Sequence, residues 1–520
     1  MHWADVLAGE LKEKGSKHLI STGITPSGFI HVGSLREAIT AQAVFKALKE
    51  KDVDAKLIYL VDSFDPLRKR YTFLPERYEA EIGKPISFMD CPCGEHVSYA
   101  EHFITPFLMA IAELGIRPEI HWTHEHYELG DFADAIDTII KKKELVATIL
   151  REVTGREVPP DFFPYTPLCP ACGKLSGGRI TDYQYPYVHY VCTCGNEGKA
   201  DIRRAQGKLP WRLEWAAKWK VFGVTCEPFG KDHAAAGGSY DTGKRFAREV
   251  LGIEPPFPVP YEFVQLKGKG QMHKSTGTTV SGVDALRMTP PPVLNYSFLR
   301  YNPDRHIDYD SGLGILDGVD EYDHVEQLYY KGGADEREID LLRAYALAQP
   351  NGPRAQQPTQ IPYRHLVSVV QIADTFEKVI EILKRTEQIS QLPKEDMELL
   401  RQRVDCVRFW LDGWAPEEVR FKVSETLPMV ELSDQELNFL RCVLTELKAM
   451  DWQGEKIHDK VYESAKSCSI GAKVGFQCLY RIFIGRNQGP RLGFFLSTLD
   501  KEFVTGRIEE AIRSAPSPAK

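Results

Sequence analysis

Glycines, hydroxyls and a histidine gather in one stretch near the N-terminus, Thr-Pro-Ser-Gly-Phe-Ile-His-Val-Gly-Ser at residues 25–34. The stretch joins a predicted strand at residues 18–21 to a predicted helix at residues 35–49. The free N–H groups and the positive dipole end of a helix N-terminus attract anions, and glycine lets a phosphate come close to the backbone. The pattern indicates a nucleotide site, and an ordinary strand-to-helix turn that merely needs glycine is the alternative.

Four cysteines further along have the spacing of a metal site. Cys169 and Cys172 form one close pair, and Cys192 and Cys194 form a second pair, separated from the first by nineteen residues. Eleven cysteines in a chain expected in the cytoplasm favour reduced thiols, so close pairs are interpreted as metal ligands before disulfides. Two such knuckles supply four thiolates to one tetrahedral zinc ion, and a closed site of this kind is structural. Unligated buried cysteines are the alternative.

A second group of metal-ligand types lies at residues 91–102. Five side chains compete there for the four places around a zinc ion, namely Cys91, Cys93, Glu95, His96 and His102. A loop with incidental cysteines and histidines is the alternative.

Secondary structure must bring these residues together. Apolar periodicity predicts a strand, a helix and a second strand at residues 18–21, 35–49 and 56–61. Such a βαβ unit is typical of a doubly wound parallel, Rossmann-type sheet, whose ligands bind where the strands end. The opening stretch lies at that edge, and so do residues 62–65 and the sequence Gly-Lys-Asp-His at residues 230–233. An aspartate such as Asp232 commonly holds ribose hydroxyls there, whereas a lone histidine such as His233 is more often structural.

Composition limits the function classes. The 520-residue chain is 43% hydrophobic and has a net charge of -8, which excludes a generally basic protein that coats nucleic acid and leaves room for local basic surfaces. Charged residues interrupt the N-terminal segment, and no uncharged apolar run reaches the roughly 20 residues of a membrane span. A cytoplasmic protein without membrane attachment is expected.

Three more regions complete the pattern. A long helix is predicted at residues 132–151, and helical periodicity dominates from residue 329 onward. A predicted strand at residues 261–266 runs into a glycine- and lysine-rich segment at residues 267–277. This loop can close over phosphates, and a mobile surface loop is the alternative.

Together these motifs resemble the class I aminoacyl-tRNA synthetases. Residues 25–34 resemble their HIGH region, and Gln271-Met-His-Lys-Ser275 resembles their KMSKS loop. Within the class, the stretch from Thr25 to Glu37, the Gly-Lys-Asp-His sequence before Gly-Gly-Ser and the cysteine-rich insertion resemble the class I lysyl-tRNA synthetases. The sequence Gln-Gly-Pro-Arg-Leu-Gly at residues 488–493 is similar to their anticodon-binding cage, a fold shared with glutamyl-tRNA synthetases. The likeness covers nearly the full chain.

The resemblance implies a two-step reaction in which lysine and ATP give lysyl-adenylate and pyrophosphate, and the lysyl group then passes to the 3′ end of tRNA(Lys). The implied partners are ATP with Mg²⁺, L-lysine and tRNA(Lys). The protein is expected to be a monomer. The residues expected to be catalytic are His31 and Lys274. The residues expected to contact ATP are Thr25, Ser27, His31, Gly33, Ser34, Gly230, Asp232, Lys274 and Ser275. Those expected to contact the amino acid are Gly23, Thr25, Glu37, Trp215 and His233.

The resemblance also implies two structural zinc ions. The family's usual ligands at the first group correspond to Cys91, Glu95, His96 and His102, and Cys93 is a softer replacement for Glu95. The second ion takes Cys169, Cys172, Cys192 and Cys194.

Three positions depart from the family pattern. Ser34 replaces the second histidine of HIGH, and Gln271 and His273 replace the first lysine and the middle serine of KMSKS, which leaves Lys274 as the lysine of the motif. These departures keep open a non-catalytic tRNA-binding paralogue. A glutamyl-type synthetase is the other alternative, but an acidic Glu37 in the pocket would repel glutamate.

The motifs divide the chain into five predicted parts. Residues 1–84 and 211–265 form the two halves of the Rossmann catalytic domain, and residues 85–210 form an insertion with the metal-ligand groups. Residues 266–328 form the KMSKS loop and a stem-contact region, and residues 329–520 form an α-helical anticodon-binding region.

Overall fold

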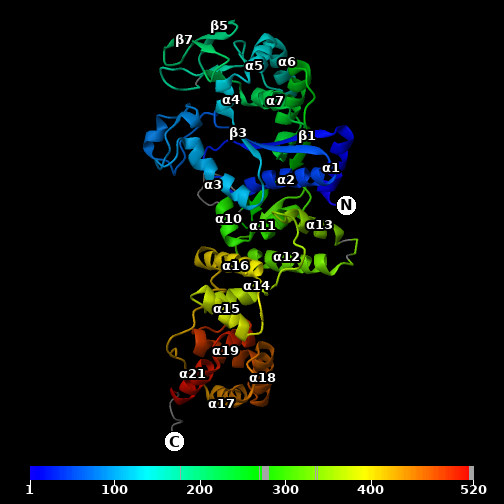
Figure 1. The fold of residues 1–520 in the computed structure, drawn as a ribbon. Helices are drawn as coiled ribbons and strands as arrows, with labels where there is room; N and C mark the ends of the chain where they lie inside the picture. Colours follow the sequence, from blue (N-terminus) through cyan, green and yellow to red (C-terminus); the bar gives the residue numbers. More distant parts are fainter. Residues whose placement is uncertain (176, 269, 272–279, 334, 337, 515–520) are drawn as a thin grey trace. The chain divides into compact units, whose positions relative to one another are not determined.

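The structure, a computed structural model, describes residues 1–175, 177–268, 270–271, 280–333, 335–336 and 338–514 (Figure 1). The chain divides into two compact units. Unit 1 comprises Met1–Leu286, Pro291–Tyr309 and Lys331–Pro353, and unit 2 comprises Arg287–Pro290, Asp310–Tyr330 and Arg354–Lys520. The five predicted domain boundaries stay a prediction, and Lys331–Pro353 packs within unit 1, whereas the sequence assigns it to the helical region.

A parallel sheet forms the centre of unit 1, as the βαβ pattern predicts. Its strands are β1 (Lys17–Ile24), β2 (Asp54–Val61), β3 (Glu119–Trp122), β9 (Cys226–Gly230) and β10 (Phe257–Tyr261). They lie in the order β10-β9-β1-β2-β3, and each neighbouring pair is parallel. The sheet is therefore doubly wound, and the carboxyl ends of its strands lie at one edge.

Helix α2 (Leu35–Glu50) confirms the helix predicted after the opening stretch, and the short turn η1 (Val32–Ser34) leads into it. The helix packs against β1, β2 and β9. Its buried apolar residues recur at helical spacing and include Leu35, Ala38, Ile39, Val44 and Leu48. This packing fixes the start of α2 at the carboxyl edge of the sheet.

Other helices of unit 1 surround the sheet and the insertion (Figure 1). They are α1 (Trp3–Lys14), α3 (Tyr99–Glu113), α4 (Thr123–Leu129), α5 (Ala133–Lys141), α6 (Lys143–Thr154), α7 (Trp211–Phe222), α8 (Lys231–Ala234), α9 (Ser239–Arg245), α11 (Pro291–Leu299) and α13 (Ile339–Ala348). Shorter turns are η2 (Glu76–Glu79), η3 (Ile86–Phe88) and the π-helical turn η4 (Phe246–Leu251). Helix α10 (Gly282–Met288) begins in unit 1 and ends in unit 2.

Two sequence predictions of secondary structure are wrong in extent. The helix predicted at residues 132–151 is divided into α5 and α6 at Lys142, which leaves helical geometry and donates to the carbonyls of Glu249 and Val250 at 3.1 and 2.7 Å. The strand predicted at residues 261–266 contains the end of β10 and a separate strand, β11 (Val264–Leu266). Strand β11 belongs to a second sheet with β12 (Gly270–Gln271) and β13 (Ile307–Tyr309).

The cysteine-rich insertion forms its own small sheets. Strands β5 (Arg179–Gln184), β6 (Tyr187–Val191) and β7 (Glu197–Asp201) make an antiparallel sheet. In the sequence, β5 and β6 lie between the two cysteine pairs and β7 follows the second pair. The two-residue strands β4 (Thr166–Pro167) and β8 (Gly207–Lys208) pair antiparallel at the base of the insertion. Apolar residues of the insertion, such as Val188 and Ile202, join one core with α5, α6 and α7.

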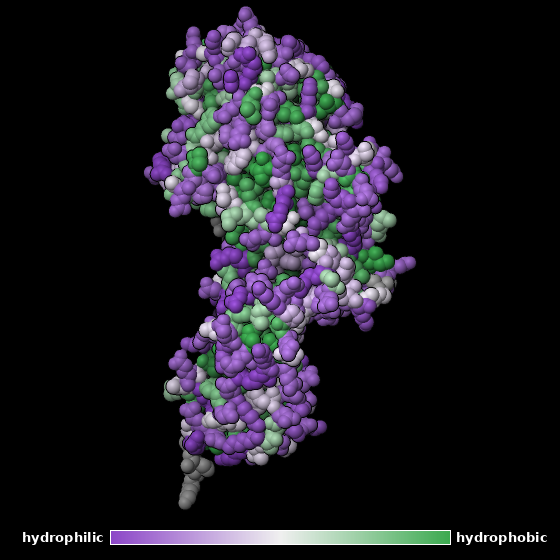
Figure 2. Space-filling view, viewed as in Figure 1, coloured by the Kyte–Doolittle hydropathy of each residue, from purple (hydrophilic) through white to green (hydrophobic). Residues whose placement is uncertain are grey.

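Unit 2 is helical, as predicted for the C-terminal region. Its helices are α12 (Gly314–Lys331), α14 (Tyr363–Val370), α15 (Phe376–Arg385), α16 (Lys394–Gly413), α17 (Asp434–Ala449), α18 (Gly454–Ser467), α19 (Ala472–Ile484), α20 (Leu492–Thr498) and α21 (Lys501–Ser514). Helices α17 to α21 share one apolar core that includes Phe439, Phe483 and Phe495. On the face shown in Figure 2, hydrophilic side chains predominate and hydrophobic ones appear as scattered groups. Among the residues that the structure describes, none of the helices combines the length and apolar character that a membrane span requires.

Candidate active site and metal-ligand groups

A cavity of about 170 Å³ opens at the carboxyl edge of the parallel sheet. Its walls come from the ends of β1, β2 and β9, from α2 and α7, and from α8. The lining residues are Thr22, Gly23, Ile24, Thr25, Glu37, Leu60, Asp62, Trp211, Trp215, Lys218, Glu227, Pro228, Phe229 and His233. The fold thus brings all five residues predicted to contact the amino acid into one cavity.

Glu37 is the acidic residue of this cavity that α2 supplies. Its carboxylate accepts hydrogen bonds from the Gly23 N–H at 2.9 Å and from the Tyr261 hydroxyl at 2.6 Å. A Cβ on residue 23 would lie 2.4 Å from the Leu60 carbonyl oxygen, so the close approach of β1 and β2 requires glycine there. Burial outweighs the two hydrogen bonds and raises the pKa of Glu37 to about 7.

Glu227 is a second acidic residue of the cavity, and it lies within the buried strand β9. Its carboxyl group accepts hydrogen bonds from the indole N–H groups of Trp215, at 3.0 Å, and Trp219. Burial raises the pKa of Glu227 to about 8, although both indoles favour the ionised form. Trp215 and Trp211 also pack their rings against His233, with centroids 5.6 and 5.3 Å apart from its ring. Aromatic faces and carboxyl groups therefore share the cavity wall.

Asp62, directly after β2, forms an ion pair with Lys218 of α7. Burial raises the pKa of Asp62 despite the nearby ammonium group. Lys218 Nζ also lies 3.5 Å from Glu214 Oε2. Three acidic residues line the cavity, and its one lysine is already paired with one of them. The cavity therefore suits a ligand with a positive charge.

The residues predicted to hold phosphates lie around the opening stretch. Ser34 stands at the N-terminal boundary of α2, and Gly33 lies in the turn η1 before it. His31 precedes η1 and forms a β-bridge with Ser281, while the Val32 N–H donates to the Val280 carbonyl at 2.8 Å. These contacts join the opening stretch to the segment that follows residues 272–279.

Other predicted ATP residues lie on either side of that stretch. The Ser27 hydroxyl contacts the Tyr71 hydroxyl at 3.2 Å, and the Ser27 carbonyl accepts from Tyr99 at 2.7 Å. Gly230 ends β9, and the exposed Asp232 follows it in α8. Lys274 and Ser275, with His273, lie outside the described residues, so their predicted roles stay predictions.

Four ligand atoms converge in the first metal-ligand group, which consists of Cys91, Cys93, His96 and His102. The two sulfur atoms lie 3.2 to 3.5 Å from each other and from the Nδ1 atoms of both histidines. Cys93 belongs to this converging group and Glu95 does not, because the short Cys-Pro-Cys link places both sulfurs beside the two imidazoles. This geometry favours Cys93 over Glu95 as the fourth ligand.

The second group consists of Cys169, Cys172, Cys192 and Cys194, as the spacing predicts. Sulfur separations are 3.7 Å between Cys169 and Cys194 and 3.8 Å between Cys172 and Cys192. Thiolates on a tetrahedral ion with metal–sulfur bonds of about 2.3 Å lie about 3.8 Å apart. Both groups could therefore hold a metal ion.

Sequence reasoning missed three residues of the active-site region. Glu227 carried a usable signal, since a carboxylate inside the apolar segment Phe-Gly-Val-Thr-Cys-Glu-Pro-Phe at residues 222–229 needs a buried partner. Lys218 shares a helical face with Trp211 and Trp215, at spacings of seven and three residues. Tyr261 offered no such signal, because its contact with Glu37 depends on how β10 lies in the sheet.

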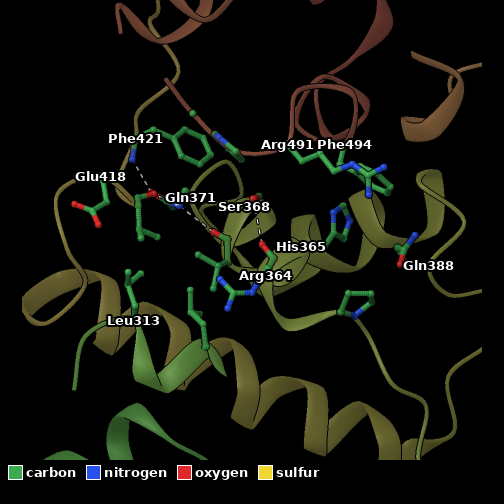
Figure 3. Close-up of a pocket in the computed structure, with 16 residues that line it drawn as sticks. Leu313, Arg364, His365, Ser368, Gln371, Gln388, Glu418, Phe421, Arg491 and Phe494 are labelled. Atoms are coloured by element: carbon green, nitrogen blue, oxygen red, sulfur yellow. Dashed lines mark hydrogen bonds between the residues drawn. The ribbon is translucent and has the colours of Figure 1, made fainter. Parts of the chain in front are cut away.

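Unit 2 contains a separate cavity of about 540 Å³ (Figure 3). Figure 3 shows Arg364, His365 and Ser368 of α14 on one side, and Arg491 with Phe494 near the start of α20 on the other. The Arg491 guanidinium lies 4.6 Å from the centre of the Phe494 ring. The remaining lining residues are Leu313, Leu316, Pro362, Val367, Gln371, Gln388, Glu418, Val419, Phe421, Gly489 and Pro490.

Two known protein families match successive parts of the chain. The family described as tRNA synthetases class I (K) matches residues 1–351, and the family described as anticodon binding domain matches residues 371–512. A lysine–tRNA ligase of Thermoplasma acidophilum is 42% identical over 516 residues, which cover 99% of this chain and 99% of the relative. A lysine–tRNA ligase of Archaeoglobus fulgidus is 40% identical over 514 residues, which cover 98% of this chain and 100% of the relative.

Among solved structures, a glutamate tRNA ligase from Elizabethkingia meningosepticum covers 96% of this chain and 100% of its own, with 13% identity and a TM-score of 0.43. The family assignment rests instead on the sequence relatives, which span the full length of both chains. The resemblance seen in the motifs is confirmed, and the chain belongs to the class I lysyl-tRNA synthetases.

Proposed function

We propose that the protein activates lysine with ATP and transfers the lysyl group to the 3′ end of tRNA(Lys). The observation that carries this proposal is the cavity at the carboxyl edge of the sheet. Glu37, Asp62 and Glu227 line it, and its one lysine, Lys218, is already paired with Asp62. The relatives named lysine–tRNA ligases support the same reaction. We further propose that the enzyme acts as a monomer in the cytoplasm, where ATP and tRNA are found.

Glu37 is the partner that we propose for the side-chain ammonium of lysine. A carboxyl group with a pKa of about 7 exchanges its proton readily near neutral pH, and an arriving ammonium ion stabilises the ionised form. Glutamate would bring a second carboxylate to the same place, which like-charge repulsion disfavours. Gly23, Thr25, Trp215 and His233 are proposed to enclose the rest of the amino acid.

The opening stretch is the proposed phosphate site. His31 and the backbone N–H groups near Gly33 and Ser34 are proposed to hold ATP phosphates at the start of α2, with Thr25 and Ser27 nearby. Asp232 beside Gly230 is proposed to hold the ribose. The lysine carboxylate then attacks the α-phosphorus in line, so catalysis consists mainly of positioning and charge stabilisation.

The loop that completes this site is proposed to supply Lys274, as a charge for the leaving pyrophosphate, and Ser275. Mg²⁺ bound with ATP would neutralise part of the phosphate charge.

The two metal-ligand groups are proposed to hold structural zinc. Thiolate and imidazole are the ligands that zinc prefers, and four protein ligands leave no position for substrate. Cys91, Cys93, His96 and His102 would hold one ion. Cys169, Cys172, Cys192 and Cys194 would hold the other.

The cavity of unit 2 is proposed to take a nucleotide of the tRNA anticodon. Arg491 offers a guanidinium group for phosphate, whereas Arg364 is already paired with Asp317 and Asp320. Phe421 and Phe494 offer ring faces for an unstacked base. This cavity lies within the region that matches the anticodon binding domain family, apart from its wall residues before 371.

Exchange of labelled pyrophosphate into ATP, measured with each of the twenty amino acids, tests the proposed reaction. Lysine is expected to give the fastest exchange. Exchange with glutamate and none with lysine would establish a glutamyl-type enzyme instead. Tight tRNA binding without exchange for any amino acid would establish a non-catalytic paralogue.

A further inference from the structure

Lys208 connects the cysteine-rich insertion to the active site. It lies in β8, where it pairs with Thr166 of β4, and Cys169 follows β4 by two residues. Its side chain points away from solvent, and the residue is 5% exposed. A lysine at the base of an insertion is ordinarily solvated, so this burial calls for a partner inside the protein.

The partners of Lys208 are two buried carboxylates. Lys208 Nζ forms an ion pair with Asp65 and lies 3.1 Å from Glu214 Oε2. The other oxygen of Asp65, Oδ2, accepts a hydrogen bond from Thr25 Oγ1 at 2.8 Å. Thr25 lines the cavity at the sheet edge. Two successive contacts, Lys208 with Asp65 and Asp65 with Thr25, therefore connect the insertion to a residue of the proposed lysine site.

The charged groups around Asp65 come from several elements. Lys208 approaches from β8, Glu214 and Lys218 belong to α7, and Asp62 lies in the same loop as Asp65. Tyr127 of α4 donates to Glu214 at 2.8 Å, without contributing a charge. Burial alone would raise the pKa of Asp65, but the two ammonium groups, Lys208 above all, outweigh burial and lower it.

The ionisation of Asp65 decides which way the Thr25 hydroxyl points. An ionised carboxylate only accepts hydrogen bonds, so Thr25 must give its hydroxyl hydrogen to Asp65. The lone pairs of Oγ1 are then directed to donors such as an ammonium group. A protonated Asp65 could donate to Thr25 instead, which would turn the hydroxyl hydrogen toward the substrate and repel its ammonium group.

We propose that Lys208 is a positioning residue for lysine activation, which keeps Asp65 ionised and thereby presents the Thr25 hydroxyl as a hydrogen-bond acceptor to the substrate. The insertion then has a function beyond its own fold, because β4 and β8 carry Lys208 to its place. This inference rests on the proposed function, and it concerns a residue that touches neither substrate nor the reacting atoms.

The variant Lys208→Met tests the inference, since methionine is also unbranched, is one atom shorter than lysine, and carries no charge. The matched control is Lys199→Met, an exposed lysine on β7 of the same insertion. Lysine-dependent pyrophosphate exchange is measured from pH 6 to pH 9, with the KM values for lysine and ATP obtained separately. Circular dichroism and thermal unfolding establish that each variant is folded.

For Lys208→Met we expect a rise of tenfold or more in the KM for lysine at pH 7, with the KM for ATP unchanged. Without the ammonium group, burial raises the pKa of Asp65, so Asp65 is protonated at low pH and ionises as the pH rises. The ratio of kcat/KM between variant and wild type should therefore increase with pH and approach one near pH 9. A merely structural defect would lower kcat/KM by the same factor at every pH. Lys199→Met should match the wild type throughout.

A second variant keeps the test decisive if Lys208→Met fails to fold. The double variant Lys208→Met/Asp65→Asn removes both charges of the buried pair and avoids an unpaired carboxylate. If Lys208 acts through Asp65, the double variant loses no more activity than Asp65→Asn alone, and its ratio to wild type is independent of pH. Additive losses, or a folded Lys208→Met with a constant ratio, would overturn the inference. A wild type without lysine-dependent exchange would overturn the proposed function itself.

Discussion

Tyr261 donates its phenolic hydrogen to Glu37 Oε2 at 2.6 Å, which ties the end of β10 to the first turn of α2. The same carboxylate accepts the Gly23 N–H from β1. Strands β1 and β10 thus hold in place one carboxyl group of α2, which lines the cavity. A cation that enters the cavity meets a carboxylate whose orientation is already set, so little conformational freedom is lost on binding.

Lysine binding should depend on pH through Glu37. The pKa of Glu37 is raised from its usual value to about 7, so the carboxyl group is protonated below pH 7 and must lose its proton before it can pair with an ammonium ion. The lysine side chain itself stays charged throughout this range. The kcat/KM for lysine should fall about tenfold per pH unit below pH 7. A flat profile between pH 5.5 and pH 7 in pyrophosphate exchange would contradict this assignment.

Arg36, one residue before Glu37, should contribute strongly to stability. The residue is 3% exposed, and its guanidinium donates to the carbonyls of Glu262, Asn302, Pro303 and Arg305 at 2.6 to 3.2 Å. Burial lowers the pKa of Arg36 to about 10. Pro303 and Asn302 keep backbone donors, from the N–H groups of Glu262 at 2.8 Å and Arg305 at 3.1 Å, whereas Arg36→Met removes the side-chain donor of the Glu262 and Arg305 carbonyls. The variant should therefore cost about 2 kcal/mol in the free energy of unfolding.

Urea unfolding measures this cost as a lower midpoint at constant slope. Because Glu262 directly follows Tyr261, the KM for lysine should rise as well. The control Arg305→Met removes an exposed arginine whose backbone stays in place. An unchanged midpoint for Arg36→Met would show that water replaces the lost donors.

Metal analysis should find two zinc ions per chain. Cys93→Ser should remove one of them, because the Cys93 sulfur lies within 3.5 Å of the other ligand atoms of its group. Glu95→Gln is the matched control and should retain both ions, because Glu95 is outside the group of converging ligand atoms. A loss of one ion from Glu95→Gln, together with full metal content in Cys93→Ser, would restore the ligand set expected from the family pattern.

Lys274 should be needed for adenylate formation. It is the lysine within the Gln-Met-His-Lys-Ser motif, and its charge would stabilise the leaving pyrophosphate. Lys274→Ala should slow pyrophosphate exchange at least tenfold, equivalent to about 1.4 kcal/mol of transition-state stabilisation. Binding of tRNA to unit 2 should be unaffected. Wild-type exchange rates in Lys274→Ala would assign the charge to another residue.

The sheet and much of the cavity follow from local sequence patterns. Apolar periodicity locates β1, α2 and β2, and the carboxyl-edge rule places whatever follows each strand at one site. Gly23 lies near the end of β1, Thr25 follows it directly, and Glu37 lies in the first turn of α2. These residues therefore converge in any doubly wound fold of this sequence. The four-cysteine group is equally local, since each pair comes from one short turn.

The residues that sequence patterns do not place depend on long-range packing. Tyr261 reaches Glu37 across 224 positions, and Lys208 reaches Asp65 across 143 positions. Neither partner can be read from spacing, because strand order and insertion docking decide both contacts. The sequence does not decide between Cys93 and Glu95 as the fourth ligand for another reason. Five suitable side chains within a short segment leave the ligand set open until the backbone path is known.

Substitution of Glu37 tests most directly the claim that this cavity binds the lysine ammonium. Glu37→Gln keeps the shape of the side chain and removes its charge, while Glu50→Gln changes an exposed glutamate at the far end of the same helix. We predict that Glu37→Gln lowers kcat/KM for lysine in pyrophosphate exchange about a hundredfold, the effect of about 2.7 kcal/mol, with the KM for ATP unchanged. Glu50→Gln should match the wild type. Wild-type kcat/KM for lysine in a folded Glu37→Gln variant would contradict the account.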